Sequence, residues 1–439
     1  MAKKIRIPKL NKFSKNVFVL AGGTMFSQLL ILLTLPVLAH LYTPAEFGVF
    51  SVYTSIVSLI LVISSLSYEV TVTMPSSDRA ASSLVHLSLY LCMGISLLSG
   101  LVFYLLQNKI ADWLNVSEIK GYFFLVIFSL FAAGVYQVLN YWLIRKKHFK
   151  QIARTKYMQS TGQVATQLTF GIVHHGSLGL IVGDLVGRSA GIWGQLKRWR
   201  KDTSAENIRV TWEDMKDNAY RYRRFPLLSS GSSLLNSFSL YLPNILLAAL
   251  YGPYEAGLYT LVQRLLGAPA ILISTSVSQV YLSEFSSNVN HRPEKIYPLF
   301  MGTLKKVTLI GLLVIGSIVV IAPHFMFLLG DQWHHTGHLL PIMAMMYIAQ
   351  FAANSVGSTI DVMERQDLHL LREIVRITIV TGALYLAWFT NQDPETAVLF
   401  LSIAATLGYL LHLSLSYRAV IKFKQQAPNL AEVSTSQAN

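Results

Sequence analysis

Hydrophobic residues fall in twelve runs, most of them long enough to cross a lipid bilayer as a helix. A helix needs about 20 predominantly apolar residues to span the hydrocarbon core. The fifth and eleventh runs are short and flanked by arginine, so their ends are the least defined. The pattern predicts an all-α integral membrane protein with about 12 transmembrane helices. The runs are 17–41, 47–71, 84–106, 121–144, 157–173, 177–196, 227–251, 256–282, 297–321, 339–362, 374–389 and 396–421.

The longest connection between two runs, residues 197–224, is dense in charges of both signs. It separates the chain into halves of about six runs each. We therefore expect an N-terminal six-helix lobe over residues 1–205 and a C-terminal six-helix lobe over residues 206–424. The polar composition of residues 425–439 predicts a disordered cytoplasmic tail.

Composition supports lipid as the main solvent of this chain. Hydrophobic residues make up 53% of the sequence and charged residues 13%, and the mean hydropathy is +0.46. This is too little polar material to coat a water-soluble globule. The chain has a net charge of +14, and its charged residues fall mainly between the apolar runs. This distribution favours an anionic membrane surface or an anionic substrate as partner over nucleic acid. The single cysteine, Cys92, excludes an intrachain disulfide framework.

The basic residues also predict the orientation of the chain. The connections on one side carry most of them, whereas those on the other side offer Lys109 and Lys120. By the positive-inside rule, both termini are cytoplasmic, which requires an even number of spans. No convincing cleavage site follows the lysine-rich start, so the first run is expected to be an uncleaved span and not a signal peptide. The basic residues in the connections of the cytoplasmic side include Arg79, Arg145, Lys146, Lys147, Arg198, Arg223, Arg365 and Arg418.

A sequence repeat links the two halves. Residues 41–50 (LYTPAEFGVF) recur as residues 250–259 (LYGPYEAGLY), with identical Leu, Tyr, Pro, Glu and Gly. Each copy joins the first and second runs of its half, and proline followed by an acid suits the first turn of a helix. Two unrelated helix starts would also produce part of this pattern, but five identities in ten at matching positions favour duplication. Because six runs separate the copies, the halves are expected to be parallel repeats about an axis along the membrane normal.

Arg264 is the first candidate for substrate contact. It lies roughly nine residues into the eighth run, and an ionisable side chain at that depth costs about 2.5–3.5 kcal/mol on insertion scales unless it has a partner or a hydrated cavity. A guanidinium stays charged at any pH and can hold a phosphate with two hydrogen bonds. The alternative is a structural arginine neutralised by a carboxylate on another helix.

Asp184 and Arg188 lie four residues apart near the middle of the sixth run. This spacing favours a self-compensating ion pair. If Arg188 were free of Asp184, it would be a second substrate-binding residue, with Asp184 as a site of ion coupling. The same run carries a stripe of small residues that lets a neighbouring helix approach closely, at Gly179, Gly183, Gly187 and Gly191.

Glu69 lies toward the cytoplasmic end of the second run. It is a candidate protonation site that would couple transport to an ion gradient, or else an interfacial residue near water. Gln28 and Asn244 are candidates for binding sugar hydroxyl groups in a hydrated cavity, although a single amide in a membrane helix is more often a bridge between helices.

Metal, cofactor and enzyme signatures are weak or missing in the sequence. The outer connections carry His334, His335 and His338, and also His174 and His175, without a supporting cysteine or glutamate constellation. No nucleotide-binding loop, nucleophile elbow or paired-acid motif is present. We therefore expect no metal, no cofactor and no catalytic residues, and hence a transporter and not an enzyme.

Several motifs in order along the chain resemble those of the polysaccharide and O-antigen (Wzx-type) flippases of the multidrug/oligosaccharidyl-lipid/polysaccharide exporter superfamily. Many of those relatives carry a basic residue before the Tyr68-Glu69 pair, where this chain has Ser67. The matching segments are Gln28 to Pro36, 41–48, Tyr68-Glu69, 74–78, 142–145 with Phe149 and Ala153, and 263–269.

The resemblance implies two six-helix lobes around a central cationic cavity that opens alternately to each side of the bacterial inner membrane. It implies an undecaprenyl-pyrophosphate-linked oligosaccharide as substrate, such as an O-antigen, capsule or exopolysaccharide repeat unit. The implied partners are membrane lipids, a polysaccharide polymerase and other assembly proteins. Arg264 would match the pyrophosphate, and Gln28 and Asn244 the sugar.

Three alternatives stay open from the sequence. A cation-coupled drug or small-molecule exporter of the same superfamily would favour an acidic, aromatic cavity. A peptidoglycan-precursor flippase resembles this fold but typically carries two further helices. A polysaccharide polymerase or ligase would usually carry a large outer loop with catalytic polar residues, whereas the outer connections here are short.

Overall fold

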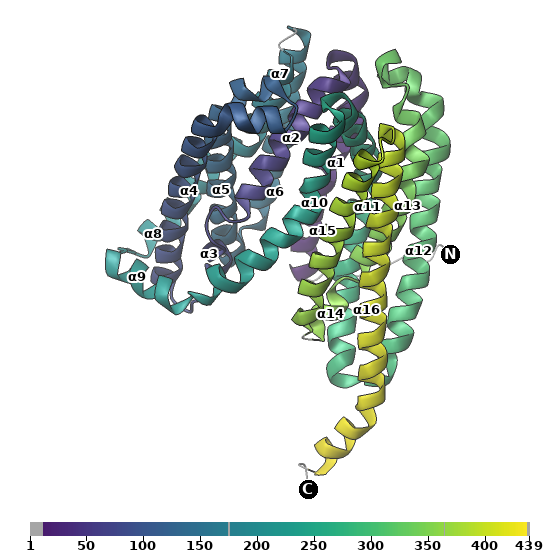
Figure 1. Ribbon diagram of the computed structural model, residues 1–439. Helices are drawn as coiled ribbons and strands as arrows, with labels where there is room; N and C mark the ends of the chain where they lie inside the picture. Colours follow the sequence, from purple (N-terminus) through teal and green to yellow (C-terminus); the bar gives the residue numbers. More distant parts are fainter. Residues whose placement is uncertain (1–11, 174–175, 364, 437–439) are drawn as a thin grey trace, which may run out of the picture. The chain divides into compact units, whose positions relative to one another are not determined.

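The computed structural model describes residues 12–173, 176–363 and 365–436, and regular structure within them is entirely helical (Figure 1). The long helices are α1 (Lys12–Leu41), α2 (Pro44–Leu61), α4 (Asp78–Trp113), α5 (Phe123–Arg145), α6 (Phe149–Ile172), α10 (Ser230–Tyr251), α11 (Pro253–His291), α12 (Ile296–Ile321), α13 (Thr336–Ser355), α15 (Gln366–Phe389) and α16 (Pro394–Ser436). The shorter ones are α3 (Tyr68–Thr71), α7 (Ser177–Ser189), α8 (Ile192–Ala205), α9 (Trp212–Arg221) and α14 (Ser358–Val362), with short η helices at Ser117–Tyr122, Phe225–Ser229, Pro293–Lys295, Ala322–Leu329 and Asp331–Trp333.

Nine helical segments among the described residues are long and apolar enough to cross a membrane by themselves. Three of the twelve predicted spans are not among them: α6, the α7–α8 pair and α15. Two of these, α6 and α15, correspond to the fifth and eleventh runs, where the sequence signal is weakest. Polar side chains enter α6 at Lys150, Arg154 and Lys156, so its helix begins earlier than its apolar run.

Three predicted spans are interrupted by turns. The run 47–71 divides into α2 and α3, because Leu66 and Ser67 adopt left-handed backbone conformations with φ of 51° and 60°. The run 177–196 divides at Gly191, with φ of 87°, and the run 339–362 divides into α13 and α14. A left-handed conformation costs a non-glycine residue about 1–2 kcal/mol, so the surrounding packing must hold the turn at Leu66 and Ser67.

By their internal contacts, the helices form two compact units. The first unit comprises the described parts of Met1–Leu38, Ile60–Gln107 and Lys120–Gly231, and the second comprises Ala39–Leu59, Asn108–Ile119 and the described parts of Ser232–Asn439. The division into lobes at residues 205 and 206 stays a prediction, because these units do not follow the chain order.

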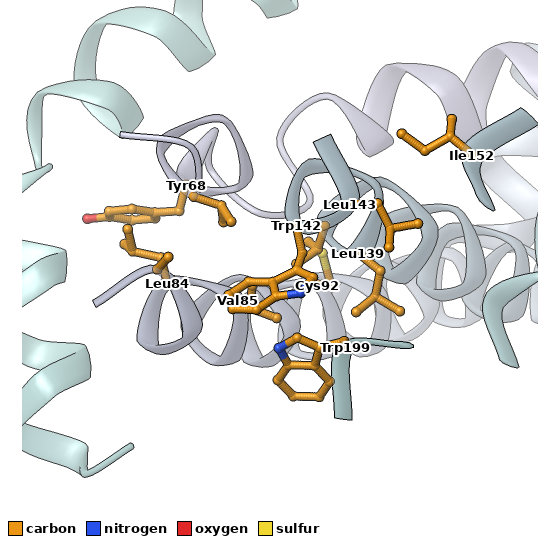
Figure 2. Packing of buried hydrophobic residues seen from close by; sticks show 12 residues of the cluster. Tyr68, Leu84, Val85, Cys92, Leu139, Trp142, Leu143, Ile152 and Trp199 are labelled. Atoms are coloured by element: carbon orange, nitrogen blue, oxygen red, sulfur yellow. The ribbon is translucent and has the colours of Figure 1, made fainter. Parts of the chain in front are cut away.

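Each unit has its own apolar core. In the first unit, Trp142 and Cys92 are fully buried in a cluster with Leu84 and Val85 of α4 and with Trp199 of α8 (Figure 2). In the second unit, a smaller cluster contains Tyr281, Phe285, Ile296, Phe300, Val356 and Val420. These clusters hold together α3, α4, α5, α6 and α8 in the first unit and α11, α12 and α16 in the second.

The two copies of the repeat pack against each other within the second unit. A Cβ atom at Gly48 of α2 would lie 1.8 Å from the carbonyl oxygen of Pro253, and one at Gly257 of α11 would lie 1.7 Å from that of Pro44. The contact is therefore reciprocal, as a two-fold relation between the copies requires. Only glycine permits so close an approach of two backbones.

The last helix, α16, reaches into the polar tail. It continues through Ser436, and residues 437–439 lie outside the described part; disorder of the tail from residue 425 stays a prediction. Adding residues to an existing helix avoids the cost of a new nucleus, so the apolar stem of α16 extends into the tail.

Candidate functional site

Arg264 lies on α11 in the second unit, with its side chain half-buried. Its guanidinium carbon is 5.1 Å from the ring centre of Phe50 and 5.5 Å from that of Phe47, both on α2. Phe47 is in turn in edge contact with the buried Trp333 at 5.1 Å between ring centres. Aromatic faces stabilise a cation by about 0.5–2 kcal/mol, so Phe47 and Phe50 help to hold the Arg264 charge in place.

Asn244 lies close to Arg264 in the fold, because it contacts the preceding residue. Its Nδ2 atom donates to Oε1 of Gln263 at 3.4 Å. Asn244 is buried, and its Oδ1 atom has no hydrogen-bond partner among the residues that the structure describes. A buried amide oxygen without a donor is costly, so this atom is suited to accept a hydrogen bond from a hydroxyl group. Gln28 is half-buried on α1 in the first unit.

Asp184 and Arg188 form the ion pair that their spacing predicts. The Nε atom of Arg188 donates to Oδ2 of Asp184 at 2.5 Å. Arg188 is therefore not free of Asp184, which was the condition for expecting it to be a second substrate-binding residue. The close helix packing predicted from the glycine stripe is confirmed: Cβ atoms at Gly183 and Gly191 would each lie 2.3 Å from side-chain atoms of α6.

This pair gives a test of the substrate role of Arg188. Arg188→Met alone leaves the Asp184 carboxylate without its partner, so we expect a loss of about 3–5 kcal/mol in stability. The double variant Asp184→Asn with Arg188→Met removes both charges and should regain most of the Tm in thermal unfolding of the purified protein. If the double variant also transports normally, Arg188 does not bind substrate.

Glu69 is buried directly after the break between α2 and α3, with 3% of its surface exposed. It accepts hydrogen bonds from the Ser65 hydroxyl and from Nε2 of Gln137, the latter at 3.1 Å. Among the residues that the structure describes, no basic side chain pairs with Glu69. A buried carboxyl group with neutral partners can exchange a proton, whereas one held by a cation stays ionised.

Ser67, at the position where many relatives of the resembled family carry a basic residue, is also buried. Its Oγ atom lies 3.0 Å from Oγ of Ser230. The first unit thus has two hydroxyl groups in contact here, where many of those relatives carry a basic residue.

Two motifs of the resemblance meet in one ion network of the first unit. Nε of Arg145 donates to Oδ1 of Asp78 at 2.7 Å, and its Nη1 donates to the carbonyl oxygen of Pro75 at 2.6 Å. Lys146 pairs with Asp78 at 2.5 Å and with Glu206 at 2.5 Å. The network holds the 74–78 loop against the end of α5.

The sequence reasoning missed a charged cluster inside the second unit. On α15, Glu373 pairs with Arg372 and, at 2.7 Å, with Arg376. Ser239 of α10 donates to Oε2 of Glu373 at 3.0 Å. The sequence pattern begins the eleventh run at residue 374, which places Arg372 in the preceding connection. The spacing of Arg372, Glu373 and Arg376, one to four residues apart, was the available signal.

The outer histidines do not form a recognisable metal site. The ring centres of His334, His335 and His338 lie 6.4 Å from one another. Within the described ranges, no group of three or more histidine, cysteine, aspartate or glutamate side chains is arranged to hold a metal ion. His174 and His175 lie outside the described residues.

One protein-family model matches a large part of the chain. The model described as "Polysaccharide biosynthesis protein" matches residues 37–337, which is more than half of the chain. The chain belongs to this polysaccharide biosynthesis protein family. The matched segment begins before the first repeat copy and includes Arg264, Glu69 and the Asp184–Arg188 pair.

A curated relative of this polysaccharide biosynthesis protein is the succinoglycan biosynthesis transport protein ExoT of Rhizobium meliloti (strain 1021). The two are 20% identical over 317 residues, which cover 71% of this chain and 61% of ExoT. The match thus spans less than two thirds of the length of that relative.

Solved structures confirm the fold of this polysaccharide biosynthesis protein. It matches the inward-facing conformation of a multidrug resistance MATE family transporter of the MOP superfamily with a TM-score of 0.68 at 14% identity, covering 94% of this chain and 96% of that one. It matches the lipid II flippase MurJ in an inward closed conformation with a TM-score of 0.68 at 12% identity, covering 96% and 91%. The protein is therefore a multi-pass membrane protein with the all-α, two-lobe fold of about twelve helices that the sequence predicts.

Proposed function

We propose that this protein moves an oligosaccharide linked to undecaprenyl pyrophosphate from the cytoplasmic to the periplasmic face of a bacterial inner membrane by alternating access. Membership in the polysaccharide biosynthesis family supports a saccharide as cargo. The observation that carries the proposal is Arg264, a fixed positive charge held against Phe47 and Phe50 inside a membrane unit.

In this proposal, the Arg264 guanidinium binds the pyrophosphate, whose oxygens match its planar set of N–H donors. Asn244, with an unsatisfied carbonyl oxygen, and Gln28 bind sugar hydroxyl groups. The polyprenyl tail stays in lipid, so the protein needs no apolar channel for it. Both termini are cytoplasmic, and no covalent bond changes during transport.

Arg188 has a smaller part in this proposal because Asp184 already holds it. Two positive charges facing a pyrophosphate would bind it more tightly, but the pair contributes no net charge. Arg264 is therefore the main phosphate ligand that we assign.

Reconstitution tests the proposal directly. The purified protein in liposomes should carry a short-chain lipid-linked oligosaccharide across the bilayer, measured as the fraction of sugar that an enzyme outside the vesicles can reach. A cation-coupled drug exporter, which shares this fold, would instead accumulate a cationic dye and leave the lipid-linked sugar in place. That result would contradict the proposal.

We further propose that Glu69 couples transport to a proton gradient. Glu69→Gln keeps the size of the side chain and its contacts with Ser65 and Gln137 but removes the titratable group. We expect a basal transport rate near that of the wild type and no acceleration when a pH gradient is imposed on the liposomes. Glu284→Gln, which makes the same change at an exposed glutamate, is the matched control and should respond to the pH gradient as the wild type does. A Glu69→Gln protein that still responds to the gradient would exclude this role.

A further inference from the structure

The second unit encloses a polar cavity that the proposed transport site does not use. Its volume is about 50 Å³, and one water molecule needs about 10–15 Å³ by the same measure, so the cavity has room for a small ion with a few waters. Helices α10, α11, α13, α15 and α16 supply its walls. Polar groups that line it include Ser239, Gln263, Tyr347, Gln350, Arg376 and Tyr409.

The charges around this cavity do not balance. Two guanidinium groups, on Arg372 and Arg376, face one carboxylate, that of Glu373. In the part of the chain that the structure describes, Glu373 is the one carboxylate in contact with either of them. Arg372, Glu373 and Arg376 together therefore carry a net charge of +1.

The donors of the cluster are also incompletely used. Arg376 is 7% exposed, and it donates from Nη2 to Glu373 and, at 3.3 Å, to Asn236. Within the described residues, the Nε atoms of both Arg372 and Arg376 are buried without a hydrogen-bond partner. Burying a charge is costly unless it is paired and its donors are satisfied. The cavity beside Arg376 is where a compensating group would bind.

We propose that this cavity binds a small monovalent anion of the size of chloride. A single negative charge cancels the excess charge of the cluster, and the cavity is too small for a sugar or a pyrophosphate. The Arg376 guanidinium and the hydroxyl and amide groups of Tyr347, Tyr409 and Gln350 are donors for such an ion. A cation would meet the same net positive charge and is disfavoured.

The site is distinct from the proposed pyrophosphate site but lies beside it. Gln263 lines the cavity, whereas the next residue, Arg264, stacks on Phe47 and Phe50. Neighbouring residues on a helix point about 100° apart, so α11 carries one site on each of two faces. The inference does not depend on the proposed transport function.

Thermal unfolding of the purified full-length protein tests the anion site. Sodium chloride is titrated against sodium gluconate at constant ionic strength, because gluconate is too large for the cavity. We expect chloride to raise Tm in a saturable way, by about 1–2 °C at ten times its dissociation constant. An identical Tm at every chloride concentration would mean that the cavity holds only water and would overturn the proposal.

Two variants locate the effect. Arg376→Gln leaves the balanced pair of Arg372 and Glu373, so its Tm should no longer depend on chloride, while Arg292→Ala, an exposed arginine after α11, should behave as the wild type. Tyr347→Phe keeps every charge but removes one donor, and it should weaken chloride binding about tenfold. If Arg376→Gln fails to fold, Tyr347→Phe decides: an unchanged half-maximal chloride concentration would contradict the site.

Discussion

Replacing Arg264 by alanine is expected to abolish flipping of the lipid-linked oligosaccharide while leaving the protein folded in the membrane. Each charge-assisted hydrogen bond from the guanidinium to a phosphate contributes about 1.5–3 kcal/mol, so the loss of two should slow transport by about 100-fold or more. The rate is measured in liposomes with the purified variant. Phe47 and Phe50 lose only a cation above their rings, which costs little stability.

Two further variants sharpen this result. Arg264→Lys keeps the charge but not the planar set of donors, so we expect an intermediate rate. Arg292→Ala removes an exposed arginine that follows the same helix and should leave the rate unchanged. Near-normal transport by Arg264→Ala would remove this residue from the mechanism.

Replacing Gly48 by alanine is the second change with a large expected effect. Its Cβ atom would overlap the carbonyl of Pro253 at 1.8 Å, and a backbone carbonyl cannot rotate aside as a side chain can. Overpacking of this kind costs about 1–3 kcal/mol, so α2 and α11 must separate and the Tm should fall. Thermal unfolding should show a loss of similar size for Gly257→Ala, because the contact is reciprocal.

The combination of the two variants is informative. Once one methyl group has forced the helices apart, the second meets less resistance, so the double variant should lose less than the sum of the single changes. Gly302→Ala is the matched control, because a Cβ there meets no atom within 4 Å; alanine should stabilise that helix slightly. Wild-type stability of Gly48→Ala would show that the close contact does not form.

Local patterns in the sequence predict most of the helices, because nine segments of the described residues are long and apolar enough to cross a membrane by themselves. They do not predict the turn at Leu66 and Ser67, since the apolar run continues through it and packing in the first unit, not local preference, holds two residues in left-handed conformations. They also place the start of α15 too late. α15 tolerates the charge of Glu373 at its buried face because Arg376 pairs with it there.

The candidate site could be predicted one residue at a time but not as an arrangement. Arg264 stands out because it is a lone charge in an apolar run, yet Phe47 and Phe50, which hold it, lie far earlier in the chain and look like ordinary core residues. Arg376 does not stand out in the sequence, because a charge at the start of a run, close to Arg372 in the preceding connection, resembles a loop residue. Only the fold shows that Glu373 lies between two guanidinium groups.

The reciprocal contact between the repeat copies has a consequence for the origin of the molecule. Gly48 meets Pro253, and Gly257 meets Pro44, so each repeat copy contributes the same residues to the contact. An isologous homodimer interface has this property. A six-helix ancestor with one copy of the segment could therefore have paired with an identical chain in parallel orientation. Gene fusion would then have preserved an existing subunit interface as the seam of a single polypeptide.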